Sequence, residues 1–266
     1  MERRIKMDNF VEYAEVPYLQ DMLNYLPISP EDEEVSSYIQ NIISLIRINY
    51  KYEQYQFAYF GLHLLYMTYI YSTAWKISQI SPERYSDVIT FAKSYSGREK
   101  DLKIEEAGSI FAYSLLPEKE ISKLFRIIDL DKSQISYVSD LVDARNEMAH
   151  ASGKFDILTE QSYDTKAHSV MSSIENIHVC MKTLIRKWFS ETLISFCNGE
   201  FNDYNERDVI EERMVQRFYL SVKELLICNE MSVSPLISAH RGFDKKLKSF
   251  KKTLLDYCKD AGYIQE

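Results

Sequence analysis

The segment from residue 36 to residue 78 contains no proline and only one glycine, Gly61. A helix can run through such a segment, whereas the short strands of a sheet need glycine, proline or other turn residues between them. The whole chain is similarly poor in these residues, with 7 glycines and 6 prolines among 266 residues. The sequence therefore predicts an all-α fold in which residues 36–78 form one long helix, with Gly61 as the place for a kink.

Two more long helices are predicted further along the chain. One covers about residues 133–151 and ends near Gly153, and the other covers about residues 159–197. Shorter helices are expected at about residues 81–94, 100–115, 117–128, 206–229 and 233–261. The predicted parts are an N-terminal extension over residues 1–35, a bundle of long antiparallel helices over 36–198, and a C-terminal helical hairpin with a basic last helix over 199–266.

Residues 57–75 carry no formal charge, and a run of this length is long enough to raise the question of a membrane span. Several tyrosines and polar side chains, among them His63, favour instead a helix of the protein core or of a dimer seam. We expect His63 to be a core histidine whose ring nitrogens are hydrogen-bonded. We also expect no membrane association.

The cysteines and histidines give no sign of a disulfide framework or a metal centre. The four cysteines are scattered without a C-x-x-C pair, and no secretory signal precedes the N-terminal segment, so reduced thiols in the cytoplasm are expected. His168 and His178 would lie about 15 Å apart along one helix, too far to share a metal. No P-loop, G-x-G-x-x-G, H-E-x-x-H or serine-nucleophile elbow is present. The sequence predicts neither a metal nor a cofactor.

The residues with the clearest chemical character are Arg145, Asn146 and His150, at the end of the helix predicted over 133–151. Arg145 keeps its charge at neutral pH and presents planar donors that suit a phosphate, while His150 can give or take a proton. These groups can cleave RNA without a metal: a base removes the ribose 2′-hydroxyl proton, the oxygen attacks the adjacent phosphorus, and the cation stabilises the phosphoryl oxygens. Asn146 is expected to orient the histidine or the phosphate.

This R-x-x-x-x-H pattern, with asparagine directly after the arginine in a helical chain, resembles the motif of HEPN domains over about residues 36–198. Many HEPN proteins are ribonucleases, so the resemblance implies an RNA-cutting toxin or antiviral (abortive infection) effector that works as a homodimer. It assigns Arg145, Asn146 and His150 to the catalytic positions of the family. It assigns supporting polar roles, less directly, to Asp140 and Asp143.

One position departs from the HEPN toxins that pair with a nucleotidyltransferase antitoxin, because these carry a tyrosine two residues after the histidine. This chain has Ser152 there, which argues against that partner and leaves another antitoxin or a sensor protein open. Residues i and i+5 of a helix lie about 140° apart around its axis, so a single helix would not direct both side chains at one point, and the dimer that the resemblance implies would ease this problem. A two-fold interface would bring Arg145 and His150 of the two copies together.

The net charge of −8 opposes binding to nucleic acid if it is spread evenly. However, residues 241–260 contain seven basic and three acidic side chains, a local charge of +4. The lysines expected to contact RNA are Lys245, Lys246, Lys248 and Lys251. The alternative is a docked amphipathic helix with a solvated basic face, because apolar residues recur there at helical spacing. These apolar residues are Phe243, Leu247, Phe250 and Leu254.

Other functions remain open. A HEPN-like protein without catalysis could act as a dimerisation or interaction module, or it could bind a nucleotide as a sensor. In such a protein Arg145 would be satisfied within its own chain, for instance by a neighbouring carboxylate, whereas an enzyme would expose it together with His150. The sequence does not specify the RNA target, the activating signal or the size of the oligomer.

Overall fold

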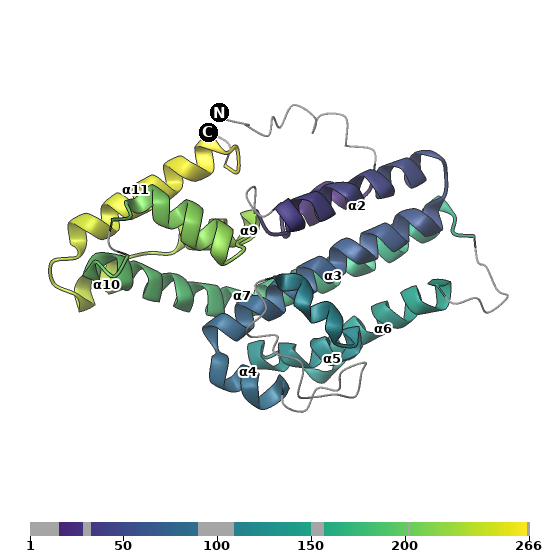
Figure 1. The fold of residues 1–266 in the computed structure, drawn as a ribbon, viewed down its shortest axis with the longest axis horizontal. Helices are drawn as coiled ribbons and strands as arrows, with labels where there is room; N and C mark the ends of the chain where they lie inside the picture. The colour runs from purple at the N-terminus through teal and green to yellow at the C-terminus, as the bar shows by residue number, and fades with distance from the viewer. Residues whose placement is uncertain (1–15, 29–32, 90–108, 150–156, 202, 265–266) are drawn as a thin grey trace. The chain divides into compact units, whose positions relative to one another are not determined.

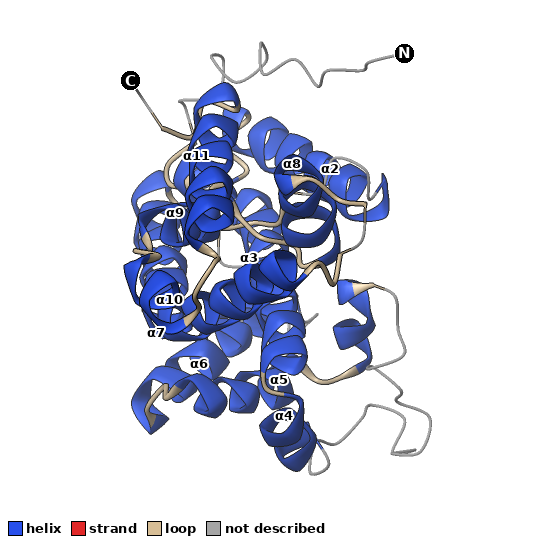
Figure 2. Ribbon diagram, turned by 90° about the vertical axis from the view of Figure 1, so that its left-hand side faces the viewer, coloured by secondary structure: helices blue, strands red, loops and turns tan. Residues whose placement is uncertain are grey.

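The computed structural model describes residues 16–28, 33–89, 109–149, 157–201 and 203–264. These residues form α-helices, short 3-10 helices and one π-helix, and no strand is found among them (Figures 1 and 2). The prediction of an all-α fold is confirmed.

Residues 36–78 form two helices rather than one. α2 (Glu33–Lys51) and α3 (Tyr55–Ile80) pack side by side as a hairpin (Figure 1). The chain reverses at residues 52–54, where Glu53 adopts a left-handed backbone conformation with a φ of 58°. The prediction of a single long helix was therefore wrong.

Gly61 lies inside α3 and does not interrupt it. A Cβ atom at this position would lie 2.6 Å from Cδ2 of Leu45 and 2.7 Å from Cγ1 of Ile46, both on α2. Because real Cβ atoms do not approach other atoms so closely, the missing side chain is what permits the close contact of α2 with α3. The glycine that was predicted to mark a kink is a packing residue.

The side chains of α3 are buried around most of the helix. Its tyrosines bond to α7 (Glu160–Asn198): the hydroxyl of Tyr66 lies 2.8 Å from Oγ of Ser173, and Tyr69 donates to the carbonyl of Ile174 at 3.1 Å. A helix that is buried around most of its surface belongs to the core, which is one of the two roles predicted for this segment. Within the described ranges, no helix is long and apolar enough to cross a membrane.

Five elements follow α3 along the chain. They are α4 (Pro82–Ile89), η5 (Ile110–Leu115), α5 (Glu118–Ser122), η6 (Lys123–Ile128) and α6 (Lys132–Ala149). α6 begins with a capping box, in which Oδ1 of Asp131 accepts from the amide of Gln134 at 2.8 Å and Oε1 of Gln134 accepts from the amide of Asp131 at 2.9 Å. The helix predicted over residues 133–151 is confirmed as far as Ala149, and its last two predicted residues lie outside the described ones.

α7 confirms the long helix predicted over residues 159–197. The chain divides into two compact units, and the division falls inside this helix. The first unit contains the chain up to Leu26, including α1 (Leu19–Leu23), together with Pro30–Cys180, and the second contains Pro27–Ser29 and Met181–Glu266. The sequence analysis had placed a domain boundary between residues 198 and 199, at the C-terminal end of α7.

Beyond α7, the second unit contains five elements. They are α8 (Glu206–Asp208), the π-helix η7 (Val209–Arg217), α9 (Val222–Glu230), α10 (Ser234–Ala239) and α11 (Asp244–Asp260). The prediction of two continuous helices over residues 206–229 and 233–261 was wrong, because each is interrupted, the second near Gly242 with a φ of 92°. The predicted apolar face of α11 is buried through Leu247, Phe250 and Leu254.

Candidate functional site

Arg145 lies in the C-terminal part of α6 and forms an ion pair with Glu118, the first residue of α5. Its Nη2 atom donates to Oε2 of the glutamate. Both side chains are largely buried, with exposed fractions of 18% for Arg145 and 16% for Glu118. The carboxylate belongs to the same chain, so the arginine of the predicted motif has an acidic partner within one protomer.

A second ion pair joins the same two helices at the surface. Nζ of Lys119 donates to Oδ2 of Asp143 at 2.6 Å, and both side chains are about half exposed. Asp143, which was expected to be a supporting polar residue, thus contributes to the α5–α6 contact that places Glu118 beside Arg145. Asp140 is exposed on α6.

The imidazole of His63, from α3, lies beside the same carboxylate. Its Nε2 atom is 3.5 Å from Oε2 of Glu118, and its side chain is fully buried. This separation is at the outer limit of a hydrogen bond, and neither ring nitrogen has a well-formed hydrogen bond to another described residue. His63 is a core histidine as predicted, but the expectation that its nitrogens are hydrogen-bonded does not hold for the described part of the chain.

The charges at this site are coupled. Burial lowers the pKa of His63, although the neighbouring Glu118 acts in the opposite direction. Burial also disfavours ionisation of Glu118, but His63 and Arg145 outweigh that effect, and the pKa of Glu118 is lowered. At neutral pH the charges of arginine and glutamate therefore offset each other and the imidazole is neutral. Protonation of His63 would give the group a net positive charge.

Tyr59 lies one helical turn before His63 on α3 and completes the cluster. Its hydroxyl is buried without a hydrogen-bond partner among the described residues, and Nζ of Lys166 lies 5.3 Å from its ring centroid. Burial raises the pKa of Tyr59 to about 12, while the charge of Arg145 acts in the opposite direction. We call the set of Tyr59, His63, Glu118 and Arg145 the Glu118 cluster.

Among the described residues, the guanidinium of Arg145 is bonded through one of its three nitrogens. A guanidinium has five N–H donors. The donor on Nη2 of Arg145 meets Glu118, and the buried Nε–H has no partner in the described ranges. An oxyanion could use the remaining donors, as phosphates do at arginine sites. It would then lie close to the Glu118 carboxylate, so its binding would be stronger when His63 is protonated.

The structure places only part of the predicted R-x-x-x-x-H motif. Asn146 is half buried on α6, directly after Arg145. His150 lies outside the described residues, directly after the last residue of α6 in sequence. The structure therefore brings Arg145 together with another histidine, His63, which the sequence did not connect to it.

The four lysines predicted to bind RNA fall into two pairs. Nζ of Lys246 donates at 2.8 Å to a carbonyl near the C-terminus of α7, and Nζ of Lys251 donates at 2.7 Å to a carbonyl near the C-terminus of α9. These two ammonium groups compensate the unpaired carbonyls of helix ends. Lys245 is exposed, and Lys248 is exposed beside Asp244.

The histidines of α7 lie among aromatic rings. The ring of His168 is 5.8 Å from that of Tyr18, and the ring of His178 is 5.1 Å from that of Tyr25. Across the described ranges, no group of three or more His, Cys, Asp or Glu side chains could hold a metal ion.

Glu118 is the residue of the cluster that sequence reasoning missed. Pro117 indicated the start of its helix, but nothing in the local sequence showed that this helix faces α6 and α3. No protein-family model, characterised protein or solved structure matched the chain. A function for this chain therefore has to follow from its own residues.

Proposed function

We propose that this chain is a metal-independent endoribonuclease of the HEPN type that acts as a toxin or antiviral effector in the cytoplasm. The observation that supports this function best is the position of the Arg145 guanidinium, which is held at one nitrogen by Glu118 and has a buried donor without a partner among the described residues. Arg145 would stabilise the phosphoryl oxygens. His150 would transfer protons, and Asn146 would orient the histidine or the phosphate.

The reaction forms a bond between the ribose 2′-oxygen and phosphorus and breaks the bond from phosphorus to the 5′-oxygen. The 2′-hydroxyl loses its proton to a base, and the leaving 5′-oxygen gains one. The products are a 2′,3′-cyclic phosphate and a 5′-hydroxyl. A homodimer would present two copies of His150, one to take a proton and one to give it.

Glu118 sets the condition under which such a site would bind RNA. Its carboxylate neutralises Arg145 in the free protein and would repel a phosphate. The pair uses a single nitrogen of the guanidinium, so a phosphate bound to the other donors would not have to replace the glutamate, although the buried Nε–H would first have to be uncovered. A cognate antitoxin or sensor protein could act at this point by favouring or opposing access to Arg145.

The test is to incubate the purified protein with total cellular RNA in EDTA and to analyse the product ends. We expect wild-type protein to give fragments that end in 2′,3′-cyclic phosphate, and His150→Ala and Arg145→Ala to give none. His168→Ala is the matched control, because this exposed histidine of α7 belongs to no part of the proposed site. Loss of cleavage in the control, or equal cleavage by wild type and His150→Ala, would contradict the proposal.

One observation favours a second function, a non-catalytic HEPN-like protein that serves as a dimerisation module or nucleotide sensor. The pairing of Arg145 with Glu118 inside one chain is the arrangement expected when the arginine has a structural role. In that case no variant would alter RNA, and Arg145→Ala would mainly lower the melting temperature. A nucleotide sensor would show a rise in melting temperature with added nucleotide.

A further inference from the structure

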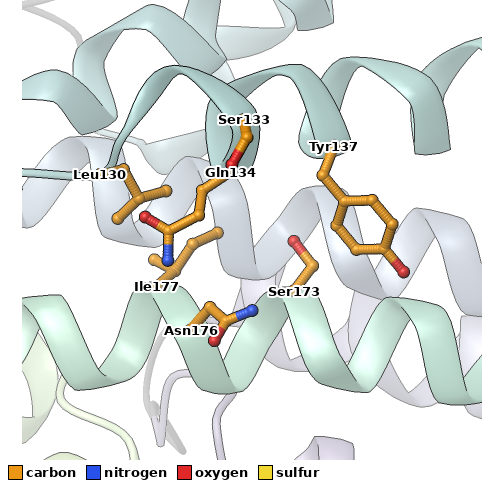
Figure 3. A pocket seen from close by; sticks show the side chains of 7 residues that line it. All are labelled: Leu130, Ser133, Gln134, Tyr137, Ser173, Asn176 and Ile177. Atoms are coloured by element: carbon orange, nitrogen blue, oxygen red, sulfur yellow. The ribbon is translucent and has the colours of Figure 1, made fainter.

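A cavity of about 310 Å³ lies between the N-terminal half of α6 and α7, within the first unit (Figure 3). Its volume is at the lower end of the range for small-molecule sites, so it suits a small ligand. Its polar lining consists of Ser133, Gln134 and Tyr137 from α6 and Ser173 and Asn176 from α7. Two aliphatic side chains complete the lining, and no lining side chain carries a charge. The cavity is therefore suited to an uncharged ligand.

Three polar groups of this cavity, those of Gln134, Ser173 and Tyr137, are held in place by contacts to other residues, whereas Asn176 is exposed. Oε1 of Gln134 accepts from a backbone amide at 2.9 Å, which leaves the NH₂ group of its amide as a donor. Oγ of Ser173 lies 2.8 Å from the hydroxyl of Tyr66, and the hydroxyl of Tyr137 donates to a carbonyl of α7 at 3.3 Å. Because these contacts orient the groups before a ligand arrives, little side-chain conformational entropy is lost on binding.

The chemistry of the lining matches a flat ring with both donors and acceptors at its edge. The amide of Gln134 lies on the α6 side of the cavity and that of Asn176 on the α7 side (Figure 3). The amide of Asn176 offers a donor and an acceptor together, which is the pairing that base edges require, and the amide of Gln134 adds a donor. The ring of Tyr137 supplies an aromatic surface, the usual stacking partner for bases of single-stranded RNA.

The cavity also lies on the helix that carries Arg145. Tyr137 precedes Arg145 by eight residues on α6, which corresponds to about 12 Å along the helix axis. A single strand with a phosphate at Arg145 could therefore place a nearby base in the cavity.

We propose that this cavity is a subsite for one nucleobase of a single-stranded RNA whose phosphate is bound at Arg145. The inference rests on the proposed function in identifying RNA as the ligand. It adds a determinant of sequence preference that lies outside the R-x-x-x-x-H motif. Gln134 and Asn176 are the residues that would distinguish the base.

Binding of short fluorescent oligonucleotides to the full-length protein tests this subsite without any need for cleavage. The probes are the four homopolymers with 2′-O-methyl riboses, which cannot undergo 2′-hydroxyl attack, and an abasic strand of the same length. We expect the wild-type protein to bind one homopolymer at least about tenfold more tightly than the abasic strand, the scale of one good base contact. Gln134→Leu and Asn176→Leu should reduce this preference several-fold and leave affinity for the abasic strand unchanged.

Gln161→Leu is the matched control, because this exposed amide of α7 is not part of the cavity, and it should keep the preference. Equal affinity for all probes, a preference that survives both cavity variants, or no binding at all would overturn the subsite. Base-dependent binding without RNA cleavage would reject the proposed ribonuclease and retain the subsite. Cleavage of RNA without base-dependent binding would retain the proposed ribonuclease and reject the subsite.

Discussion

Nε2 of His63 lies 3.5 Å from Oε2 of Glu118, the same oxygen that accepts from Arg145. Three helices, α3, α5 and α6, thus each contribute one ionisable group to a single point in the first unit. Charges at this range in a largely buried site interact strongly, so the ionisation of each group depends on the others. Any role of Arg145 in binding an anion is therefore coupled to the protonation of His63.

The first prediction concerns the stability that the Glu118 carboxylate provides. Glu118→Gln keeps the size of the side chain but leaves the largely buried Arg145 without a counter-charge. We expect the free energy of unfolding, measured with urea at neutral pH, to fall by about 1–3 kcal/mol. Glu191→Gln is the control, because Glu191 and its partner Lys187 are 58% and 59% exposed, and it should change stability by less than about 0.5 kcal/mol. If both substitutions lower the free energy of unfolding by the same amount, the pair of Glu118 with Arg145 contributes no more to stability than an exposed ion pair.

The second prediction concerns acid sensitivity. In the unfolded chain His63 is protonated around its ordinary pKa of 6.5, whereas burial lowers its pKa in the folded protein. Below about pH 6.5 the unfolded state binds more protons, so stability decreases as the pH falls towards the lower pKa of the folded state. The pKa of Glu118 is also lowered in the folded protein, so below its ordinary pKa of 4.5 this residue too makes the folded state less stable as the pH falls. The urea midpoint should therefore drop between about pH 7.5 and about pH 5.5.

His63→Leu removes the titrating group and should flatten this pH dependence, whatever its effect on stability at neutral pH. His168→Gln changes an exposed histidine and should leave the dependence as in the wild type. A curve for His63→Leu that parallels the wild-type curve would mean that another group causes the acid sensitivity.

Much of the fold could be predicted from helical periodicity and from the scarcity of turn residues, but the break between α2 and α3 could not. Residues 52–54 contain neither glycine nor proline, and Glu53 takes a φ of 58° that favours glycine in other chains. Gly61 was the only local signal for an interruption. It instead serves packing between helices, which a single sequence does not reveal.

The third prediction tests the packing role of Gly61. Gly61→Ala should favour the helix through its backbone propensity by about 1 kcal/mol but clash with α2, for a net loss of about 1–3 kcal/mol. The clash with Leu45 can be isolated, since its Cδ2 atom lies 2.6 Å from the position of the new Cβ. In a Leu45→Ala background the same substitution should therefore be less costly. Additive effects of the two substitutions would contradict a direct clash.

For the candidate site too, part could be predicted from the local sequence and part depends on tertiary contacts. The sequence singled out Arg145 because it and its neighbours resemble a known motif, and it predicted that His63 is buried. It could not pair Arg145 with Glu118, which lies 27 residues away, because that contact depends on how α5 packs against α6. Contacts of this kind are determined by tertiary packing rather than by spacing along one helix.

The last prediction separates two roles for the lysines of α11. Lys245 and Lys248 face solvent, whereas Lys246 and Lys251 bond carbonyls near the ends of α7 and α9. If α11 contacts RNA, Lys245→Gln with Lys248→Gln should weaken RNA binding and reduce the salt slope by about one per lost phosphate contact. Binding measured across a salt series would show the effect. The free energy of unfolding should hardly change.

Lys246→Gln with Lys251→Gln is the matched double variant, because it removes the same charge from the same helix. It should lower the free energy of unfolding by about 1–2 kcal/mol through loss of the bonds to helix-end carbonyls. Its effect on the salt slope should be the smaller of the two, since these ammonium groups are already engaged within the second unit. If both variants leave the salt slope unchanged, α11 is a docked amphipathic helix with a solvated basic face and takes no part in RNA binding.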